Sequence, residues 1–198
     1  MTNSFGISGN NLQRVGSTVV KKYLRNSNGQ RRELFILQNL KSLRVPEILN
    51  SDNPDELHFK YIEGLNGKEA IEGGYAKEVL YEMGMFLREL QNINTSMASG
   101  HIPGNGSVIC HGDFAHYNSI LSTASPNLLA IVDWEACCIG DPVMDIAWCE
   151  FQFLRQFPNH KWALQNLFKG YGSTPAFEQR EKSVNDRLKY LQKINSYE

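Results

Sequence analysis

Two segments of the sequence decide how this chain folds: His111-Gly112-Asp113-Phe114-Ala115-His116-Tyr117-Asn118 and Ile131-Val132-Asp133-Trp134-Glu135. The first places an acid, Asp113, five residues before an amide, Asn118, and the second is an apolar strand that ends in Asp133. With each named residue type filling roughly one position in twenty to fifty, this spacing of His, Asp and Asn arises by chance in about one such chain per hundred. The pattern therefore indicates a functional site.

The side chains of Asp113, Asn118 and Asp133 suit the transfer of a phosphoryl group. Asp113 can accept or orient the proton of an acceptor hydroxyl, and the other two offer the oxygen ligands that Mg²⁺ prefers. A short hairpin between the segments brings the three positions together. Phosphoryl transfer asks little of a protein beyond such positioning and the neutralisation of charge. The pattern predicts a phosphotransferase, with unrelated aspartate turns and a loop-capping asparagine as the alternative.

The size and composition fit one domain or two small lobes. The chain has 198 residues, of which 41% are hydrophobic and 21% charged, as in ordinary globular proteins. No Lys/Arg run predicts binding to nucleic acid, no apolar run approaches the ~18 residues of a membrane span, and the N-terminus lacks a signal-peptide pattern. The four cysteines lack C-x-x-C spacing, which favours reduced, mostly buried thiols. We therefore expect a cytoplasmic protein without membrane or nucleic-acid partners.

Charge is divided unevenly along the chain. Residues 1–64 contain nine Lys/Arg and six Asp/Glu, whereas residues 65–198 contain eleven and fifteen, so the two parts carry +3 and −4. A basic N-terminal part suits a polyanionic nucleotide, and an acidic C-terminal part suits a cationic acceptor. Random variation of surface charge explains the same numbers about equally well.

Apolar patterning predicts a β-rich N-terminal part and a helical C-terminal part. The expected strands of the first part are residues 12–15, 18–24, 47–49 and 57–62. A stripe of apolar positions predicts a helix over Arg31–Leu43, after a loop at Arg25–Gly29. Beyond a hinge at residues 63–67, the expected helices are 75–92, 142–153, 162–171 and 177–194, and the expected hairpin is 119–121 with 128–132.

Three blocks of the sequence resemble the aminoglycoside phosphotransferase and choline kinase-like family, which shares the protein-kinase fold. The family pattern is an H-G-D segment with Asn five residues after the Asp, an apolar strand into D-W or D-F, then G-D-P and D-L-A. Here the blocks are residues 111–121, residues 131–135 and Gly140-Asp141-Pro142-Val143-Met144-Asp145-Ile146-Ala147. The resemblance implies an α+β, bilobal, protein-kinase-like fold: a small antiparallel-sheet N-lobe (1–63) and a mainly helical C-lobe (64–198).

The resemblance also implies roles for individual residues. Asp113 corresponds to the catalytic aspartate, Asn118 and Asp133 to metal ligands, and the implied cofactors are ATP and Mg²⁺. Lys21 resembles the strand lysine that binds the α- and β-phosphates, and Glu33 resembles the helix glutamate that pairs with it. For Glu33 the alternative is an ordinary first-turn acid that the helix dipole favours.

The choice of Lys21 competes with Lys22. Neighbouring side chains on a strand point to opposite faces, so only one of the two lysines can point into a cleft. Lys21 is preferred because it directly follows the apolar pair Val19-Val20. Two solvent-exposed strand lysines are the alternative.

Two further segments complete the expected nucleotide site. Ser8, Gly9 and Asn10 form a polar turn whose backbone N–H groups can approach phosphate, although G-x-G-x-x-G is absent. Tyr61 and Ile62 correspond to the segment that offers backbone contacts to adenine.

The sequence thus predicts an ATP- and Mg²⁺-dependent phosphotransferase acting on a hydroxyl of a small molecule, such as an amino sugar, a choline-like alcohol or a related metabolite. The alternatives are a non-catalytic, pseudokinase-like nucleotide-binding module that acts through partners, and a structural protein without a ligand. The chain is short for the family on the acceptor side, because only 53 residues follow Asp145. That leaves open a small substrate, an oligomer that completes the pocket, or nucleotide binding without efficient transfer.

Overall fold

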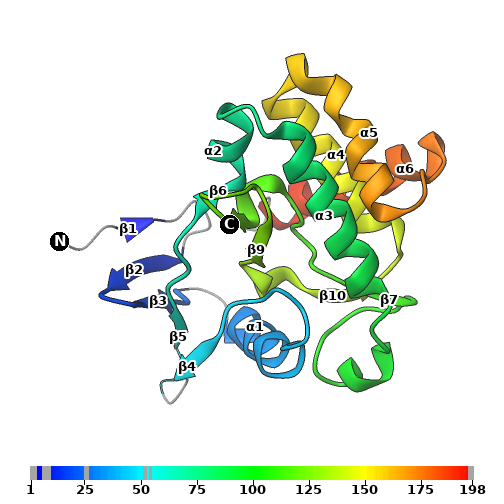
Figure 1. The fold of residues 1–198 in the computed structure, drawn as a ribbon. Helices are drawn as coiled ribbons and strands as arrows, with labels where there is room; N and C mark the ends of the chain where they lie inside the picture. The colour runs from blue at the N-terminus through cyan, green and yellow to red at the C-terminus, as the bar shows by residue number, and fades with distance from the viewer. Residues whose placement is uncertain (1–3, 6–9, 25–26, 51–52, 54, 196–198) are drawn as a thin grey trace.

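The computed structural model describes residues 4–5, 10–24, 27–50, 53 and 55–195. Its elements form a sheet at the N-terminal end of the chain and a helical body that carries both motif segments (Figure 1). Within the described residues, every helix is too short or too polar to cross a membrane.

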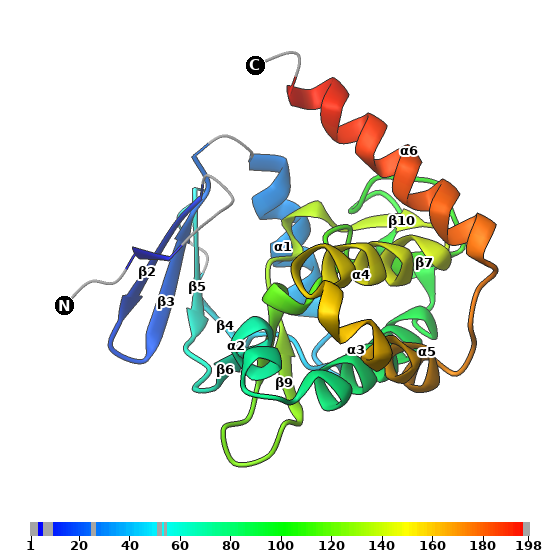
Figure 2. The same ribbon diagram turned by 90° about the horizontal axis from the view of Figure 1, so that it is seen from above.

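The N-terminal sheet has five antiparallel strands in the order β1-β2-β3-β5-β4. Their bounds are Ser4–Phe5 (β1), Asn11–Val15 (β2), Thr18–Lys22 (β3), Ile48–Asn50 (β4) and Glu56–Lys60 (β5). β2 and β3 form a hairpin around Gly16, whose φ of +61° is a conformation that favours glycine. The β-branched start of β3 favours a strand. In Figure 2 this sheet lies to the left of the helices.

Helix α1 (Ser27–Asn39) lies between the sheet and the helical body and contacts both. The sequence prediction of Arg31–Leu43 was wrong by four residues at each end. The polar residues that precede the apolar stripe join the helix, because tertiary contacts override weak helix propensity. After Asn39 the chain turns, with the Leu43 N–H donating to the Leu40 carbonyl, and extends toward Pro46.

The helical body starts at β6 and contains two small sheets besides its helices. One sheet has the order β6-β8-β9 and the other pairs β10 with β7. The strands are Leu65–Asn66 (β6), Val108–Cys110 (β7), Ser119–Leu121 (β8), Leu128–Ile131 (β9) and Cys138–Gly140 (β10). The α-helices are Gly67–Glu72 (α2), Ala76–Gln91 (α3), Val143–Gln156 (α4), Leu164–Tyr171 (α5) and Phe177–Asn195 (α6). Short 3-10 helices are Thr95–Ala98 (η1), His116–Asn118 (η2), Trp134–Ala136 (η3) and Pro158–Ala163 (η4).

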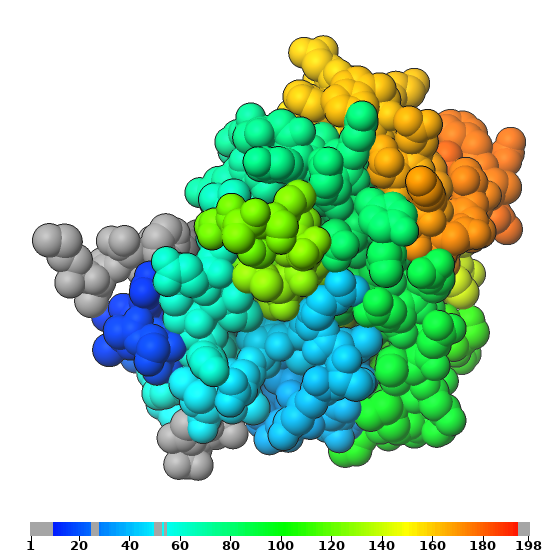
Figure 3. All heavy atoms as spheres, viewed as in Figure 1, coloured from blue at the N-terminus to red at the C-terminus, as the bar shows by residue number. Residues whose placement is uncertain are grey.

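Helix α3 is the central helix of this body, and one face of it is buried along its whole length. It packs against α5 through two glycines. A Cβ at Gly84 would lie 2.1 Å from the carbonyl oxygen of Leu167, and a Cβ at Gly170 would lie 2.1 Å from that of Tyr81. The backbones of α3 and α5 are therefore in direct contact. In the space-filling view the atoms of the two helices form a continuous surface (Figure 3).

The sheet and α1 lie within residues 4–60, and the helical body follows from residue 65. The boundary between residues 63 and 64 stays a prediction. Apart from the shift of α1, the expected strands and long helices are found within a few residues of their predicted bounds, whereas α2 and the 3-10 helices were not expected.

Candidate active site

The two motif segments are joined by a short hairpin. Strand β7 ends just before His111, and η2 leads into β8, which pairs with β9 in antiparallel fashion. Beside that pair, the N–H of Val132 donates to the carbonyl oxygen of Asn118 at 2.9 Å. The hairpin expected from the sequence therefore sets Asn118 beside the residue that precedes Asp133.

The loop before Asp113 is held by two buried polar side chains, Asp145 and His111. The Asp145 carboxylate accepts hydrogen bonds from the backbone N–H groups of His111 (2.6 Å) and Gly112 (3.0 Å). His111 Nδ1 accepts from the N–H of Asp113 (3.2 Å), and Nε2 lies 2.9 Å from the carbonyl oxygen of Val132. The imidazole of His111 thus braces the first segment against the second.

Gly112 brings the same loop into direct backbone contact with the second segment. Its φ is +84°, and a Cβ at this position would lie 2.1 Å from the carbonyl oxygen of Ala136 in η3. A side chain at position 112 would strain the backbone and push the two loops apart.

We expect Asp145→Asn to lower the free energy of unfolding by about 1–3 kcal/mol, the cost of a buried donor left without a partner. An amide keeps one acceptor oxygen but turns an NH₂ group toward one of the two N–H donors. Burial raises the pKa of the Asp145 carboxyl, against the effect of His111 and the two amides. Urea denaturation measures the change, with the exposed Asp186→Asn as control. Equal midpoints for both variants would contradict the bracing role.

Asp113 lies at the end of this loop, and its two carboxylate oxygens have different surroundings. Oδ1 accepts from the indole Nε1 of Trp148 (2.8 Å) and from Nη2 of Arg187 (3.3 Å), and the Tyr117 hydroxyl lies 3.3 Å away. Oδ2 has longer contacts, 3.4 Å to Nδ2 of Asn118 and 3.5 Å to the Tyr117 hydroxyl. Oδ2 is therefore the oxygen freer to receive a hydrogen bond from a ligand.

Three of these neighbours were missed from the sequence. Tyr117 lies inside the first segment, and Trp148 follows Asp145 by three residues on α4, so closeness to the motif was the available signal. Trp148 is buried, and its Nε1 donates to Asp113. Arg187 is 74 residues away from Asp113 on α6, and no sequence pattern marks it.

The expected metal ligands Asn118 and Asp133 come from the two sides of the hairpin. Nδ2 of Asn118 donates to the carbonyl oxygen of Asp113 at 2.9 Å, so its Oδ1 is left without a partner among the described residues. Asp133 has φ 69° and ψ 60°, and it is the only described non-glycine residue in the left-handed region. Aspartate is among the few residues that tolerate this conformation, and such conformations cluster at functional sites.

Lys21 lies in a cluster of carboxylates. Its Nζ lies 2.6 Å from Glu33, 2.5 Å from Asp133 and 3.2 Å from Glu135, and the side chain is 2% exposed. Tyr23 donates its hydroxyl to the same Glu33 oxygen at 2.5 Å. Burial disfavours the charged ammonium, but the three carboxylates outweigh burial and raise the pKa of Lys21. Burial likewise raises the pKa of Glu135, against the effect of Lys21.

The two strand lysines have opposite environments. Lys21 points inward to the carboxylates, whereas Lys22 is 53% exposed and pairs with Glu56 at 2.7 Å. The two lysines therefore point to opposite faces of β3, and Lys21, which was preferred from the sequence, is the one that points inward. Because α1 begins at Ser27, Glu33 lies beyond the first helical turn, so the helix dipole does not account for it.

The donor set around Lys21 fits a divalent metal ion. One carboxylate oxygen from each of Glu33, Asp133 and Glu135 lies within 4.8 Å of the others. Carboxylate and amide oxygens, such as those of Asp133 and Asn118, are the ligands that Mg²⁺ prefers. Glu135, which follows Asp133 by two residues, thus lies in the same cluster.

The expected phosphate turn is described only at Asn10, because Ser8 and Gly9 lie outside the described residues. The Asn10 side chain donates from Nδ2 to the carboxylate of Glu135. The start of β2 is therefore linked to η3, next to Asp133.

The expected adenine segment follows β5. The N–H of Tyr61 donates to the carbonyl of Ser17 at 2.7 Å, and the guanidinium of Arg14 lies 3.5 Å from the centre of the Tyr61 ring. The amide of Tyr61 is thus already used within the sheet. Ile62 is half-buried, and its contact to a nucleotide stays a prediction.

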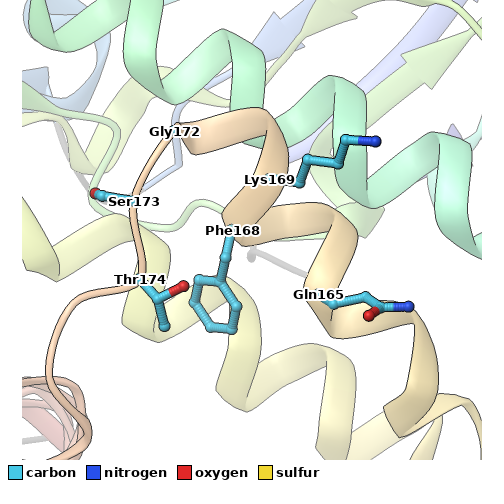
Figure 4. A pocket seen from close by; sticks show the side chains of 6 residues that line it. All are labelled: Gln165, Phe168, Lys169, Gly172, Ser173 and Thr174. Carbon is cyan, nitrogen blue, oxygen red and sulfur yellow. The ribbon is translucent and has the colours of Figure 1, made fainter.

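A hollow of about 390 Å³ lies at the C-terminal end of α5 (Figure 4). Its lining is Gln165, Phe168, Lys169, Gly172, Ser173 and Thr174. None of the motif residues contributes to it, so this hollow is distinct from the cluster around Asp113 and Lys21.

Comparisons with solved structures define the class of fold. The chain is similar to aminoglycoside phosphotransferase APH(2'')-IIa in its ternary complex with streptomycin and ATP (16% identity, 100% of this chain and 88% of the other, TM-score 0.73). It is also similar to aminoglycoside phosphotransferase APH(3'')-Id from Streptomyces rimosus (16% identity, 92% of this chain and 89% of the other, TM-score 0.69). A third similar structure is a choline/ethanolamine kinase family protein from Mesorhizobium loti (14% identity, 99% of this chain and 81% of the other, TM-score 0.67). The α+β, bilobal, protein-kinase-like fold predicted from the sequence is confirmed.

A family model matches the motif region itself. Residues 100–180 fit the phosphotransferase enzyme family, so the resemblance to the aminoglycoside phosphotransferase and choline kinase-like family is confirmed. A comparison with curated protein sequences gave no significant match. The family match supports a phosphotransferase, and Arg187 lies beyond the matched residues.

Proposed function

We propose that this protein is an ATP- and Mg²⁺-dependent phosphotransferase that transfers the γ-phosphoryl group to a hydroxyl of a small molecule. The observation that carries the proposal is the grouping of Asp113, Asn118 and Asp133 on one hairpin, with Lys21 2.5 Å from Asp133. The family match over residues 100–180 and the ATP and ADP complexes among similar structures support it.

On the acceptor side, Asp113 is the residue suited to take a proton. Its Oδ1 is fixed by Trp148 and Arg187, so Oδ2 would accept the hydrogen bond of the acceptor hydroxyl and then its proton. His111 and Asp145 hold the loop in place through hydrogen bonds to its backbone, and they would take no part in the proton transfer itself.

On the nucleotide side, Asn118 and Asp133 would hold Mg²⁺, and Lys21 would hold phosphate oxygens while Glu33 orients it. When bound, ATP supplies the phosphoryl group and Mg²⁺ neutralises part of its charge. Glu135 shares Lys21 with Asp133 and also accepts from Asn10, so it would tie the phosphate turn to the metal ligands.

We expect Lys21→Met to weaken Mg–ATP binding by about 10–100-fold, the loss of a hydrogen bond between charged groups. Lys22→Met is the matched control, since it removes the same charge from the next position of β3 but on the exposed face. Calorimetric titration of both variants measures the change in Kd. Equal affinities for the two variants would remove Lys21 from the phosphate site.

The proposal is tested by combining two measurements on the wild-type protein. Mg–ATP should raise the melting temperature, and a screen of hydroxyl compounds should find one that makes ATP consumption acceptor-dependent. If Mg–ATP raises the melting temperature but no compound makes ATP consumption acceptor-dependent, the result favours the non-catalytic nucleotide-binding module instead. A melting temperature that does not rise with Mg–ATP would contradict both the phosphotransferase and the nucleotide-binding module.

Several finer predictions accompany the proposal. A cationic acceptor was predicted from the charge balance, and an amino sugar or a choline-like alcohol was predicted together with the family resemblance. The positive charge of Arg187 beside Asp113 competes with a cationic acceptor. A cytoplasmic location, the absence of nucleic-acid partners and an oligomer that completes the acceptor pocket also stay predictions.

A further inference from the structure

Helix α6 places the guanidinium of Arg187 beside the candidate catalytic carboxylate of Asp113. The helix packs along α4, as Figure 2 shows, and Arg180 on α6 pairs with Glu150 on α4 at 2.6 Å. Two turns further on, Nη2 of Arg187 lies 3.3 Å from Oδ1 of Asp113. The acceptor side of the site is therefore partly built by α6, outside the residues that match the family model.

The guanidinium of Arg187 has unused hydrogen-bonding capacity. A guanidinium has five N–H donors, and the contact with Asp113 is the only hydrogen bond of Arg187 among the described residues. Its Nε is enclosed and has no partner there, while the side chain as a whole is 16% exposed. The group is thus within reach of a ligand and able to donate to it.

The surroundings of Arg187 disfavour a cationic acceptor. An ammonium placed near Asp113 would approach the guanidinium, and two like charges about 4 Å apart repel by about 1–4 kcal/mol between bulk water and a protein surface. The ring of Trp148 could otherwise receive a cation, but Arg187 already lies over it, with its central carbon 4.3 Å from the ring centre.

The carboxylates on α4 do not offset this positive charge. Asp145 is buried and accepts the amides of His111 and Gly112, and Glu150 is paired with Arg180. Both are thus engaged in holding the fold. Beyond the carboxylate of Asp113 itself, a ligand at this position therefore meets the guanidinium of Arg187 and no free carboxylate from α4.

Resting on the proposed function, we propose that Arg187 is a specificity-determining residue that recognises an oxyanion on the acceptor, a carboxylate or a phosphate close to the hydroxyl. An acceptor whose hydroxyl binds at Oδ2 of Asp113 presents its neighbouring substituent to the guanidinium, which is held at Oδ1. Arginine forms strong, directional hydrogen bonds with both carboxylate and phosphate. The acceptor class is thus a hydroxy acid or a phosphorylated alcohol.

The test uses four acceptors that share one skeleton and differ in one substituent: glycerate (carboxylate), glycerol phosphate (phosphate), glycerol (neutral) and aminopropanediol (ammonium). Acceptor-dependent ATP consumption is measured with the full chain and Mg²⁺. We expect kcat/KM for at least one oxyanion acceptor to exceed that for glycerol and aminopropanediol by about 10-fold or more. The first two acceptors distinguish carboxylate from phosphate.

The variant Arg187→Met keeps an apolar contact with Trp148 and removes the charge. The loss of the contact with Asp113 affects every acceptor, but the variant should raise KM for the oxyanion acceptor by about 10–100-fold more than it raises KM for glycerol. Arg187→Lys should recover part of the loss. Lys189→Met, which removes the same charge from an exposed position of α6, is the control. An equal loss of kcat on every acceptor, or a wild-type preference for aminopropanediol, would overturn the inference.

Binding separates this inference from the proposed function. With a non-hydrolysable ATP analogue and Mg²⁺ present, calorimetry measures the affinity of glycerate and glycerol phosphate for the wild type and for Arg187→Met. Binding that depends on Arg187 without turnover supports the inference while counting against phosphotransfer. Absence of binding to the wild type, or equal binding to both proteins, sinks the inference even where phosphotransfer to another acceptor is found.

Discussion

Replacing Asp113 with asparagine is expected to lower the proposed rate of acceptor phosphorylation by about 10²–10⁴-fold, the usual contribution of a positioned general base. The amide matches the carboxylate in shape, so the Trp148 and Arg187 contacts to the retained oxygen survive. The amide cannot take a proton from the acceptor. The binding of Mg–ATP stays unchanged within a few-fold, because Asp113 is not among the residues assigned to the nucleotide.

Two measurements on Asp113→Asn are needed together. Acceptor-dependent ATP consumption gives the loss of turnover, and the rise in melting temperature with Mg–ATP shows that nucleotide binding is intact. Asp186→Asn makes the same chemical change on the exposed part of α6 and serves as the control. Turnover retained by Asp113→Asn would remove the residue from its assigned role.

Replacing Asp133, the proposed metal ligand, with asparagine is expected to weaken the binding of Mg–ATP by about 100-fold, which corresponds to the upper range for a hydrogen bond between charged groups. The variant loses the negative charge of a metal ligand and the 2.5 Å ion pair with Lys21. Because asparagine also tolerates positive φ, the effect reports the charge and not the strain of the backbone.

A second variant separates the backbone from the charge. Asp133→Ala places a side chain that disfavours the left-handed region at φ 69°, and it should cost about 1–2 kcal/mol of stability beyond that of Asp133→Asn. Affinity for ATP is titrated with and without Mg²⁺, and stability is measured in urea. If Mg²⁺ enhances ATP binding to Asp133→Asn as strongly as to the wild type, the metal assignment is wrong.

The parts of the site that the sequence predicted are those fixed by short-range geometry. Asp113 lies in the loop just before η2, Asn118 is the last residue of η2, and a hairpin joins them to Asp133, so spacing along the chain almost determines their spacing in the fold. Lys21 was favoured over Lys22 by the alternation of a strand and by the apolar pair before it. Their arrangement agrees with the predicted site, and their chemical roles stay predictions.

The parts that were missed depend on contacts between distant segments. Arg187 reaches Asp113 only because α6 packs along α4, and a 3.6-residue pattern of apolar residues gives no information about which helix will be its neighbour. Asn10 meets Glu135 across 125 residues for the same kind of reason. The ends of α1 were misplaced because contacts with the sheet and with η3, together with the turn after Asn39, rather than the apolar stripe, decide which residues are helical.

The absent side chain at position 112 has a mechanical consequence. Because the main chain of Gly112 packs directly against Ala136, this contact resists relative movement of the loop that carries Asp113 and the segment that carries Asp133. We therefore expect any opening that admits a nucleotide to occur where Asn10 and Lys21 of the N-terminal part contact Glu135 and Asp133. In hydrogen exchange, the amides around Gly112 and Ala136 should therefore respond to nucleotide as one unit, and those at the start of β2 as another.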